Sequence, residues 1–349
     1  MPNQLPMPLF YNPKTARDWA YSPNQMKLFE SSAGWKREHN VKPAATDKFN
    51  LHVLLIDVQK DFCFKEGSLY VGGRSGDGAL DDNQRTAEWI YRNLHRITKM
   101  SCTMDTHFAY QIFFPSFFLD QDDKPLSAFR TVVADEIRSG KVKVNPAVTH
   151  LVNDYAWLQK QVIHYCQELE KQGKYQLYMW PAHCILGSDG HALVGSIHEA
   201  RMFHSYIRGA QSDCEVKGGH LLTENYSVLR PEVLTRHDGQ GALAQKNTHF
   251  IQTLLKADAV VIAGQAASHC VLSSIDDLLN EIHTQDPTLA KKVYVMTDCM
   301  SSVTVPDGKG GFFADFTDNA QKAQQKFADA GMHLVKSTDP IDGWPDLKI

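Results

Sequence analysis

The sequence lacks the features that mark membrane, secreted and nucleic-acid-binding proteins. No run of residues approaches the roughly 18 consecutive apolar residues of a membrane-spanning helix, so no membrane partner is expected. The N-terminus has no charged segment followed by an apolar core, which argues against a secretory signal. The net charge is only −4, and this value gives no reason to expect a nucleic-acid partner.

Cysteine is also sparse, with seven residues scattered over 349 positions. An odd and dispersed set does not form a disulfide framework and is typical of free thiols in a reducing compartment. We therefore expect a cytoplasmic protein. The apolar fraction of 43% and the charged fraction of 22% are those of an ordinary globular chain, which at this length forms one large domain or two modest ones.

Composition changes along the chain and suggests how it is divided. Residues 1–48 contain prolines, aromatic residues and charges but show no period. Because disordered tails are poor in aromatic residues, we interpret this segment as an extension that wraps the domain, with a disordered tail as the alternative. A single domain is predicted over residues 49–345, with an insertion at about 113–174. The aromatic run at 113–118 is expected at a pocket mouth, at a subunit contact or in a packed loop.

Strands and helices alternate from residue 49 onward. The apolar runs predict strands at about 51–56, 101–104, 175–179, 215–216, 259–263 and 292–297, with a short closing strand at 332–335. Helical periods predict helices at about 79–99, 194–207, 245–256, 268–283 and 316–330. This alternation predicts an α/β protein with three α/β/α layers and a mostly parallel central sheet of about six strands.

Chemically reactive residues follow several of the predicted strands. Asp57 ends the first apolar run, Asp105 and Lys217 follow two others, and Cys270 lies just inside the helix after the strand at 259–263. Ligand sites in such folds lie at the carboxyl ends of the strands, so we expect these side chains to share one site. A helix N-terminus favours a thiolate, which makes Cys270 a candidate nucleophile. The alternative is a small buried apolar residue.

Five short motifs occur in the order acid, Asp-x-His, Trp-Pro-x-His, lysine and cysteine. They read LLIDVQKDF from residue 54, MDTH from 104, WPAHC from 180, VKG from 216 and GQAASHCV from 264. This order resembles the nicotinamidase/isochorismatase-like cysteine hydrolases, specifically their metal-bearing nicotinamidase branch. The resemblance covers about residues 57–298. It implies an isochorismatase-like fold and hydrolysis of a small amide through a cysteine thioester, with nicotinamide giving nicotinate and ammonia as the first expectation.

The same resemblance implies catalytic roles for residues of this chain. Cys270 would be the nucleophile, Asp57 would move the protons, and Lys217 would stabilise both as a fixed cation. The backbone N–H groups of Ala266 and Cys270 would form an oxyanion hole. A cis peptide bond is expected between Gln265 and Ala266.

Asp105, His107 and His183 are the predicted metal ligands. One carboxylate and two imidazoles suit a divalent ion with water completing its shell, and zinc is expected ahead of iron or manganese. Family members with a fourth His or Glu after the Asp-x-His differ from this chain, which leaves a weakly held or absent metal as the alternative. Phe62 and Trp180 would form aromatic walls around a flat substrate, with core packing as the other interpretation.

Two other functions stay open at this point. A related cysteine hydrolase would act on a ureido, carbamoyl or maleamate-type amide. A non-catalytic family member would instead bind a partner. A siderophore-type isochorismatase fits less well, because those enzymes do not rely on this cysteine. The expected partner is a small-molecule amide, and a homo-oligomer is compatible with the sequence.

Overall fold

The computed structural model describes residues 4–173 and 175–349, and within them six strands form one parallel central sheet. The strand order is β12–β9–β8–β1–β2–β7. The bounds are β1 (Leu51–Ile56), β2 (Lys99–Asp105), β7 (Asp213–Lys217), β8 (Ala259–Gly264), β9 (Val293–Met296) and β12 (His333–Val335). Strands β1 and β8 are buried along their whole length, as expected for apolar runs covered on both faces.

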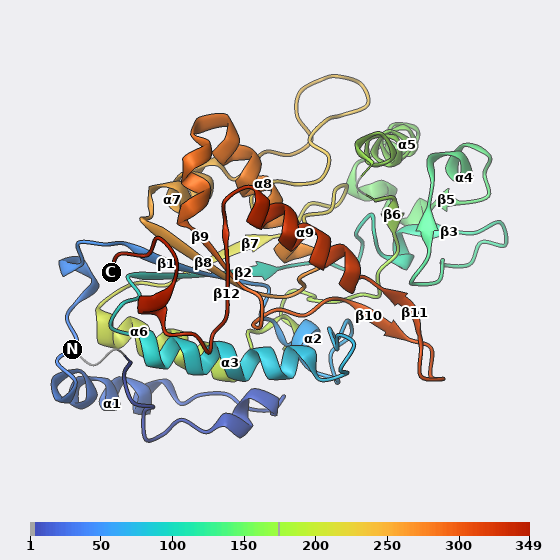
Figure 1. Ribbon diagram of the computed structural model, residues 1–349. Helices are drawn as coiled ribbons and strands as arrows, with labels where there is room; N and C mark the ends of the chain where they lie inside the picture. Colours follow the sequence, from blue (N-terminus) through green and yellow to red (C-terminus); the bar gives the residue numbers. More distant parts are fainter. Residues whose placement is uncertain (1–3, 174) are drawn as a thin grey trace.

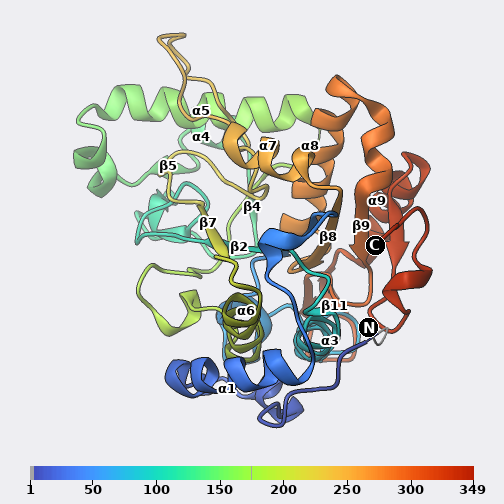
Figure 2. The same ribbon diagram turned by 90° about the vertical axis from the view of Figure 1, so that its left-hand side faces the viewer.

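Helices cover both faces of the sheet and complete the three predicted layers (Figures 1 and 2). One layer contains α3 (Gly78–Asn93) and α6 (Gly195–Arg208), with α1 (Gln25–Glu38) packed outside α6. The other contains α7 (Thr248–Lys256), α8 (Cys270–Gln285) and α9 (Thr317–Asp329).

Alternate residues of β1 point into the two layers, because successive side chains of a strand face opposite sides. Val53 and Leu55 join one core, whereas Leu54 and Ile56 join the other.

Smaller elements lie beyond the sheet. The short strands are β3 (Phe118–Leu119), β4 (Thr131–Val132), β5 (Lys143–Val144), β6 (Leu177–Tyr178), β10 (Thr304–Pro306) and β11 (Phe312–Asp315). The remaining α-helices of the described residues are α2 (Lys60–Cys63), α4 (Ala134–Arg138) and α5 (Tyr155–Gln172). Short 3₁₀ helices lie at Pro13–Arg17, Ala44–Thr46, Pro115–Phe117, Pro146–Leu151, Asp189–His191, Pro287–Lys292 and Ile341–Gly343. In Figure 1 the elements α4, α5, β3, β5 and β6 lie together at one side of the central layers.

The predicted fold class is confirmed, but one of its strands was wrongly assigned. The strand expected at 175–179 shortens to Leu177–Tyr178 and pairs antiparallel with β4, outside the central sheet. The short strand expected at the end of the chain, β12, is instead the sixth strand of the sheet. Both segments are short apolar runs, and pairing partners depend on tertiary contacts that local patterns do not encode.

The helix predicted at 79–99 also ends early, at Asn93, because the residues from Lys99 onward belong to β2. The predicted helix was too long because Ile97 was included in its apolar period. Ile97 is buried in the core but lies in the connection between the helix and the strand.

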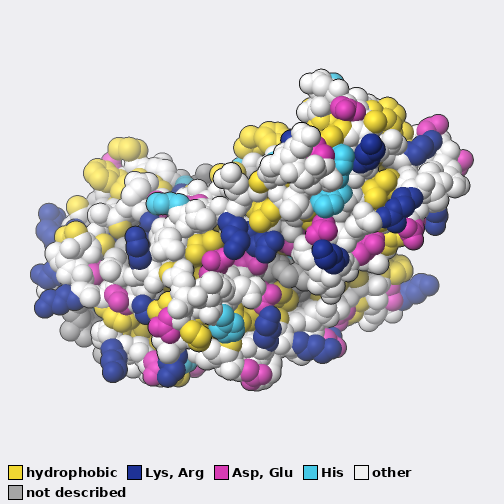
Figure 3. All heavy atoms as spheres, turned by 90° about the horizontal axis from the view of Figure 1, so that it is seen from above, with side chains coloured by type: hydrophobic (Ala, Val, Ile, Leu, Met, Phe, Trp, Pro, Cys, Tyr) yellow, Lys and Arg dark blue, Asp and Glu magenta, His cyan; other side chains and the backbone are white. Residues whose placement is uncertain are grey.

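Residues 4–48 pack against the α3 and α6 layer. Leu5, Leu28 and Val41 are buried, and the Leu5 N–H donates a 2.9 Å hydrogen bond to the Arg92 carbonyl. The division at residue 49 and the insertion at about 113–174 remain predictions. None of the described helices is long and apolar enough to cross a membrane. Figure 3 shows acidic and basic side chains interspersed over one face of the molecule.

Candidate active site

Four neighbouring strands deliver the predicted reactive residues to one edge of the sheet. Asp57 directly follows β1, Asp105 is the last residue of β2, and Lys217 is the last residue of β7. Cys270 begins α8, just after β8. Because β8, β1, β2 and β7 are adjacent and parallel, their carboxyl ends lie side by side. The structure therefore brings all four side chains together.

Lys217 lies at the centre of this group. Its Nζ is 2.9 Å from Asp57 Oδ2, 2.9 Å from Asp105 Oδ1 and 3.7 Å from the Cys270 sulfur. It also donates a 2.8 Å hydrogen bond to the Asn225 carbonyl. The lysine is 5% exposed and Asp57 is fully buried. Buried charges persist only when they are paired at close range, so the contacts of Lys217 hold the group together.

Burial sets the protonation of these groups. It raises the pKa of Asp57; the Lys217 cation opposes this shift and the Asp105 charge adds to it. Thr103 donates a hydrogen bond to the Asp57 carboxylate. Burial alone would lower the pKa of Lys217, but the two carboxylates outweigh it and raise that pKa. The lysine is therefore a permanent cation at neutral pH.

The nucleophile candidate differs from expectation in its protonation. Burial raises the pKa of the Cys270 thiol well above its ordinary value, Lys217 only partly offsets this, and Asp57 and Asp105 raise it further. The helix N-terminus predicted a thiolate, whereas the buried site holds a protonated thiol with a carboxyl group beside it.

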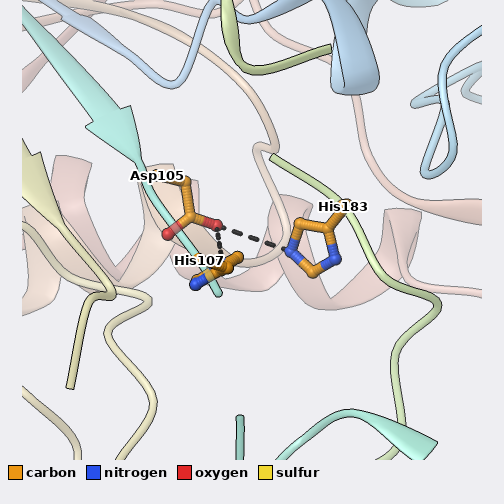
Figure 4. A group of neighbouring side chains, drawn as sticks. All are labelled: Asp105, His107 and His183. Carbon is orange, nitrogen blue, oxygen red and sulfur yellow. Dashed lines mark hydrogen bonds and ion pairs between the residues drawn. The ribbon is translucent and has the colours of Figure 1, made fainter. Parts of the chain in front are cut away.

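Asp105, His107 and His183 form a compact group of potential metal ligands (Figure 4). One ligand atom of each lies within 4.8 Å of the others. Asp105 Oδ2 is 2.9 Å from His107 Nε2 and 3.5 Å from His183 Nε2. His107 Nδ1 lies 3.1 Å from the Gly218 carbonyl, and His183 Nδ1 lies 2.7 Å from the Pro181 carbonyl. A proton on each Nδ1 would satisfy these backbone acceptors, and each Nε2, which faces the carboxylate, would then be the ring atom available to bind a metal.

This donor set fits a divalent cation. In that tautomer, each Nε2 lone pair faces a carboxylate oxygen, so two acceptors meet without a proton between them. A cation held between them would remove this repulsion. The backbone is packed tightly against the group at Gly218, whose φ is +85°. A Cβ at this position would lie 2.5 Å from His107 Cε1 and 2.7 Å from Asp105 Oδ1. A Cys-free set of one carboxylate and two imidazoles suits zinc, iron or manganese.

The aromatic run at 113–118 packs against this group. The ring of Phe113 lies 4.9 Å from that of His107, edge to face, and Phe114 lies 5.5 Å from both histidine rings. Phe113 also lines the cavity that Cys270 faces. The run therefore lies in a packed loop beside the pocket, because Phe114, Phe117 and Phe118 are buried in the core and Phe113 lines the cavity.

A cavity joins the Cys270 group to the Asp105 group. The cavity has a volume of about 40 Å³ and accommodates only a small ligand. Phe62 and Trp180 line it, in the positions expected of aromatic walls. Ala266 and Cys270 line it as well, and the Gln265–Ala266 peptide bond is cis.

Backbone hydrogen bonds fix the loop around the expected oxyanion hole. The N–H of Ala267 donates to the Ser301 carbonyl at 2.7 Å, and the N–H of Val271 donates to the Ala266 carbonyl at 3.1 Å. These two neighbours of the predicted N–H donors are therefore already engaged.

Sequence reasoning missed several residues of the site. Glu224, Tyr226 and His269 line the same cavity. Burial raises the pKa of Glu224 to about 8, and the Tyr165 hydroxyl donates to its carboxyl group at 2.7 Å. Gln59 pairs with the backbone of Asp105 through bonds of 2.7 and 2.8 Å. The signals available were the ENYS tetrapeptide after the lysine and the histidine directly before the cysteine, but neither pattern indicates a direction for the side chain.

The fold and site define an α/β protein with a buried Asp–Lys–Cys group beside an Asp–His–His group. No family model and no curated protein sequence matches the chain. Solved structures with a similar fold include a nicotinamidase/pyrazinamidase from Acinetobacter baumanii, at 17% identity and a TM-score of 0.46, which covers 84% of this chain and 99% of that one. The yeast nicotinamidase has 17% identity and a TM-score of 0.48, covering 82% and 99%. A zinc complex of the pyrazinamidase of Pyrococcus horikoshii has 14% identity and a TM-score of 0.43, covering 82% and 99%. At such identities the likeness concerns the fold alone.

Proposed function

We propose that this protein is a cysteine amidohydrolase and that it cleaves nicotinamide to nicotinate and ammonia. The observation that carries the proposal is the position of Lys217, which contacts the acid beside the thiol and a carboxylate of the possible metal group. A non-catalytic protein has no need to bury a carboxyl group and a thiol against the same ammonium group. Buried charged groups in a cavity are typical of active sites.

In the first half of the reaction, Asp57 takes the Cys270 proton while the sulfur attacks the carbonyl carbon of the amide. The raised pKa of Asp57 makes it a better base, and Lys217 stabilises the negative charge that develops on sulfur. The N–H groups of Ala266 and Cys270 would stabilise the oxyanion. Asp57 then gives the proton to the leaving nitrogen. The C–N bond breaks, ammonia departs, and a thioester to Cys270 remains.

In the second half, water attacks the thioester carbonyl and Asp57 takes a proton from that water. The C–S bond breaks, Asp57 gives that proton to the sulfur, and the product leaves as the carboxylic acid, which keeps the second proton of the water. The net reaction consumes one amide and one water and forms one acid and one ammonia. The same carboxyl group thus moves the proton in both halves, and Lys217 remains charged throughout.

A divalent ion fits beside this machinery. Asp105, His107 and His183 would hold it, and when bound it would supply a Lewis-acidic contact for a ring nitrogen. The chain's own contribution is orientation, because Phe113 and Trp180 line the small cavity and present faces or edges to a flat ring. A planar heteroaromatic amide satisfies both features, which is why we place nicotinamide ahead of ureido, carbamoyl and maleamate-type amides.

Ammonia release from a panel of small amides tests the proposal. Nicotinamide should have the highest kcat/KM, and Cys270→Ala should release no ammonia from it. A higher kcat/KM for maleamate or a ureido compound would support a cysteine hydrolase whose substrate is not nicotinamide. Absence of turnover with every amide, in a folded and metal-loaded protein, would contradict the enzymatic proposal.

A further inference from the structure

A second and larger cavity lies against the catalytic one. Its volume is about 400 Å³, compared with about 40 Å³ for the cavity at Cys270. Trp180, Tyr226 and His269 line both cavities. The two spaces therefore share a wall, and nothing in the proposed reaction uses the larger one.

Aromatic rings build the second cavity and hold one another in place. Tyr178 lies 4.7 Å from Trp180, and Tyr175 lies 5.0 Å from Tyr226, measured between ring centroids. The Trp180 indole N–H donates to the Tyr226 hydroxyl at 2.7 Å. Phe316, at the start of α9, also lines the space. Rings fixed in this way form a ready surface for stacking, since little side-chain freedom remains to be lost when a flat ligand binds.

The charge of the lining restricts the ligand. Asp276 is the one acidic residue among the described residues that line the cavity, and no lysine or arginine of the described chain lines it. Asp276 pairs with Lys326, so its charge is partly compensated. Burial lowers the pKa of His269 to about 4, so this ring is neutral at physiological pH. Among the described lining residues, a phosphate or carboxylate would therefore find no lysine or arginine side chain to bind.

We propose that the second cavity binds a flat aromatic group that carries no negative charge. Such a group has two possible sources. The first is the distal ring of a carboxamide substrate larger than nicotinamide, and in that case the inference rests on the proposed function. The second is a separate molecule, which would influence the catalytic cavity only through the residues of the shared wall. The recognition chemistry is the same for both, because both stack on the same rings.

A binding experiment tests the cavity without any turnover. The ligand is 2-naphthol, which has no amide and no ring nitrogen, and its anionic counterpart is 2-naphthoate; both are titrated calorimetrically into the Cys270→Ala protein. Leu272→Trp and Asn319→Trp fill the cavity from α8 and α9, since both residues line it and neither belongs to the catalytic group. Asn280→Trp, on an exposed position of α8 outside the cavity, is the matched control.

We expect 2-naphthol to bind the Cys270→Ala protein and to lose about tenfold in affinity in each filling variant, because the added indole occupies space that the ligand needs. The control variant should bind it unchanged, and 2-naphthoate should bind at least about tenfold more weakly because its charge has no partner. Equal 2-naphthol affinity in all variants would overturn the proposal. So would equal affinity for naphthol and naphthoate.

Kinetics then distinguish the two sources. The assay compares nicotinamide with 5-phenylnicotinamide, which adds a second ring, in the wild type and in the filling variants. A rise in KM for the phenyl compound alone assigns the cavity to an extended substrate. Unchanged kinetics for both amides, together with lost naphthol binding, assign it to a separate molecule. If neither amide is hydrolysed, the proposed function fails while the calorimetry still decides the cavity.

Discussion

The substitution Gly218→Ala examines how tightly the backbone is packed against the proposed metal group. Gly218 has a φ of +85°, and an added Cβ would lie 2.5 Å from His107 Cε1 and 2.7 Å from Asp105 Oδ1. The backbone conformation costs a residue with a Cβ about 1–3 kcal/mol. Displacing the two packed side chains adds about 1–3 kcal/mol of overpacking. The expected loss in the free energy of unfolding is therefore about 2–6 kcal/mol.

The neighbouring Gly219 provides a matched control, because a Cβ there would lie 3.8 Å from Phe108 Cε2, an ordinary van der Waals contact. We expect Gly219→Ala to change stability by less than about 1 kcal/mol. Urea unfolding of both variants gives the energies, and elemental analysis after dialysis against zinc gives the metal content. Gly218→Ala should retain less zinc than Gly219→Ala, since Asp105 and His107 are displaced together. Equal stability and equal zinc content in the two variants would refute this reasoning.

Four further predictions concern the reactive groups. Cys270→Ala should lower kcat by several orders of magnitude while leaving the urea midpoint nearly unchanged, and retention of a tenth of the activity would exclude the thioester. Iodoacetamide should modify Cys270 more slowly than the exposed Cys214 at neutral pH, because the pKa of Cys270 is raised, and the rate at Cys270 should increase as the pH rises. Mass spectrometry of the labelled peptides measures both rates. Fast labelling of Cys270 at neutral pH would contradict the protonated thiol. Lys217→Met should lower the free energy of unfolding by about 3–5 kcal/mol and abolish turnover. The control Lys99→Met, which breaks a partly exposed ion pair, should lower it by less than about 1 kcal/mol. Similar losses in the two variants would argue against Lys217 as the cation that organises the site. His183→Ala should lose stoichiometric metal and raise the KM for nicotinamide more than it lowers kcat, with metal that persists in this variant placing the ion elsewhere.

The central layers of the fold could be predicted because their signals are local. Leu51–Ile56 and Ala259–Gly264 are uninterrupted apolar runs, and parallel strands covered on both faces require such runs. Residues at or soon after the carboxyl ends of parallel strands share one edge of the sheet, which is why Asp57, Lys217 and Cys270 were expected to lie together. The strand order and the antiparallel pairing of β6 with β4 depend on contacts between distant segments, and no local period encodes them.

The loops around the site were harder to predict for the same reason. Glu224, Tyr226 and His269 reach the cavity because the segments after β7 and β8 fold back over the sheet edge, and a polar tetrapeptide does not specify that path. The second cavity was also beyond sequence reasoning. Its walls come from Tyr175, Leu272 and Phe316, which belong to three separate parts of the chain and share no motif.

The protonation of Cys270 shows which physical effect dominates at the start of α8. A helix N-terminus stabilises a negative charge by about 0.3–1 kcal/mol, which is less than one pKa unit. Full burial shifts a pKa by up to about 3–5 units in the opposite sense for an acid. Lys217 lies 3.7 Å from the sulfur but is already paired with two carboxylates, so it cannot reverse the effect of burial. The thiolate therefore has to form during the attack itself, as Asp57 takes the proton, and the position of Asp57 becomes as important to the reaction as the sulfur.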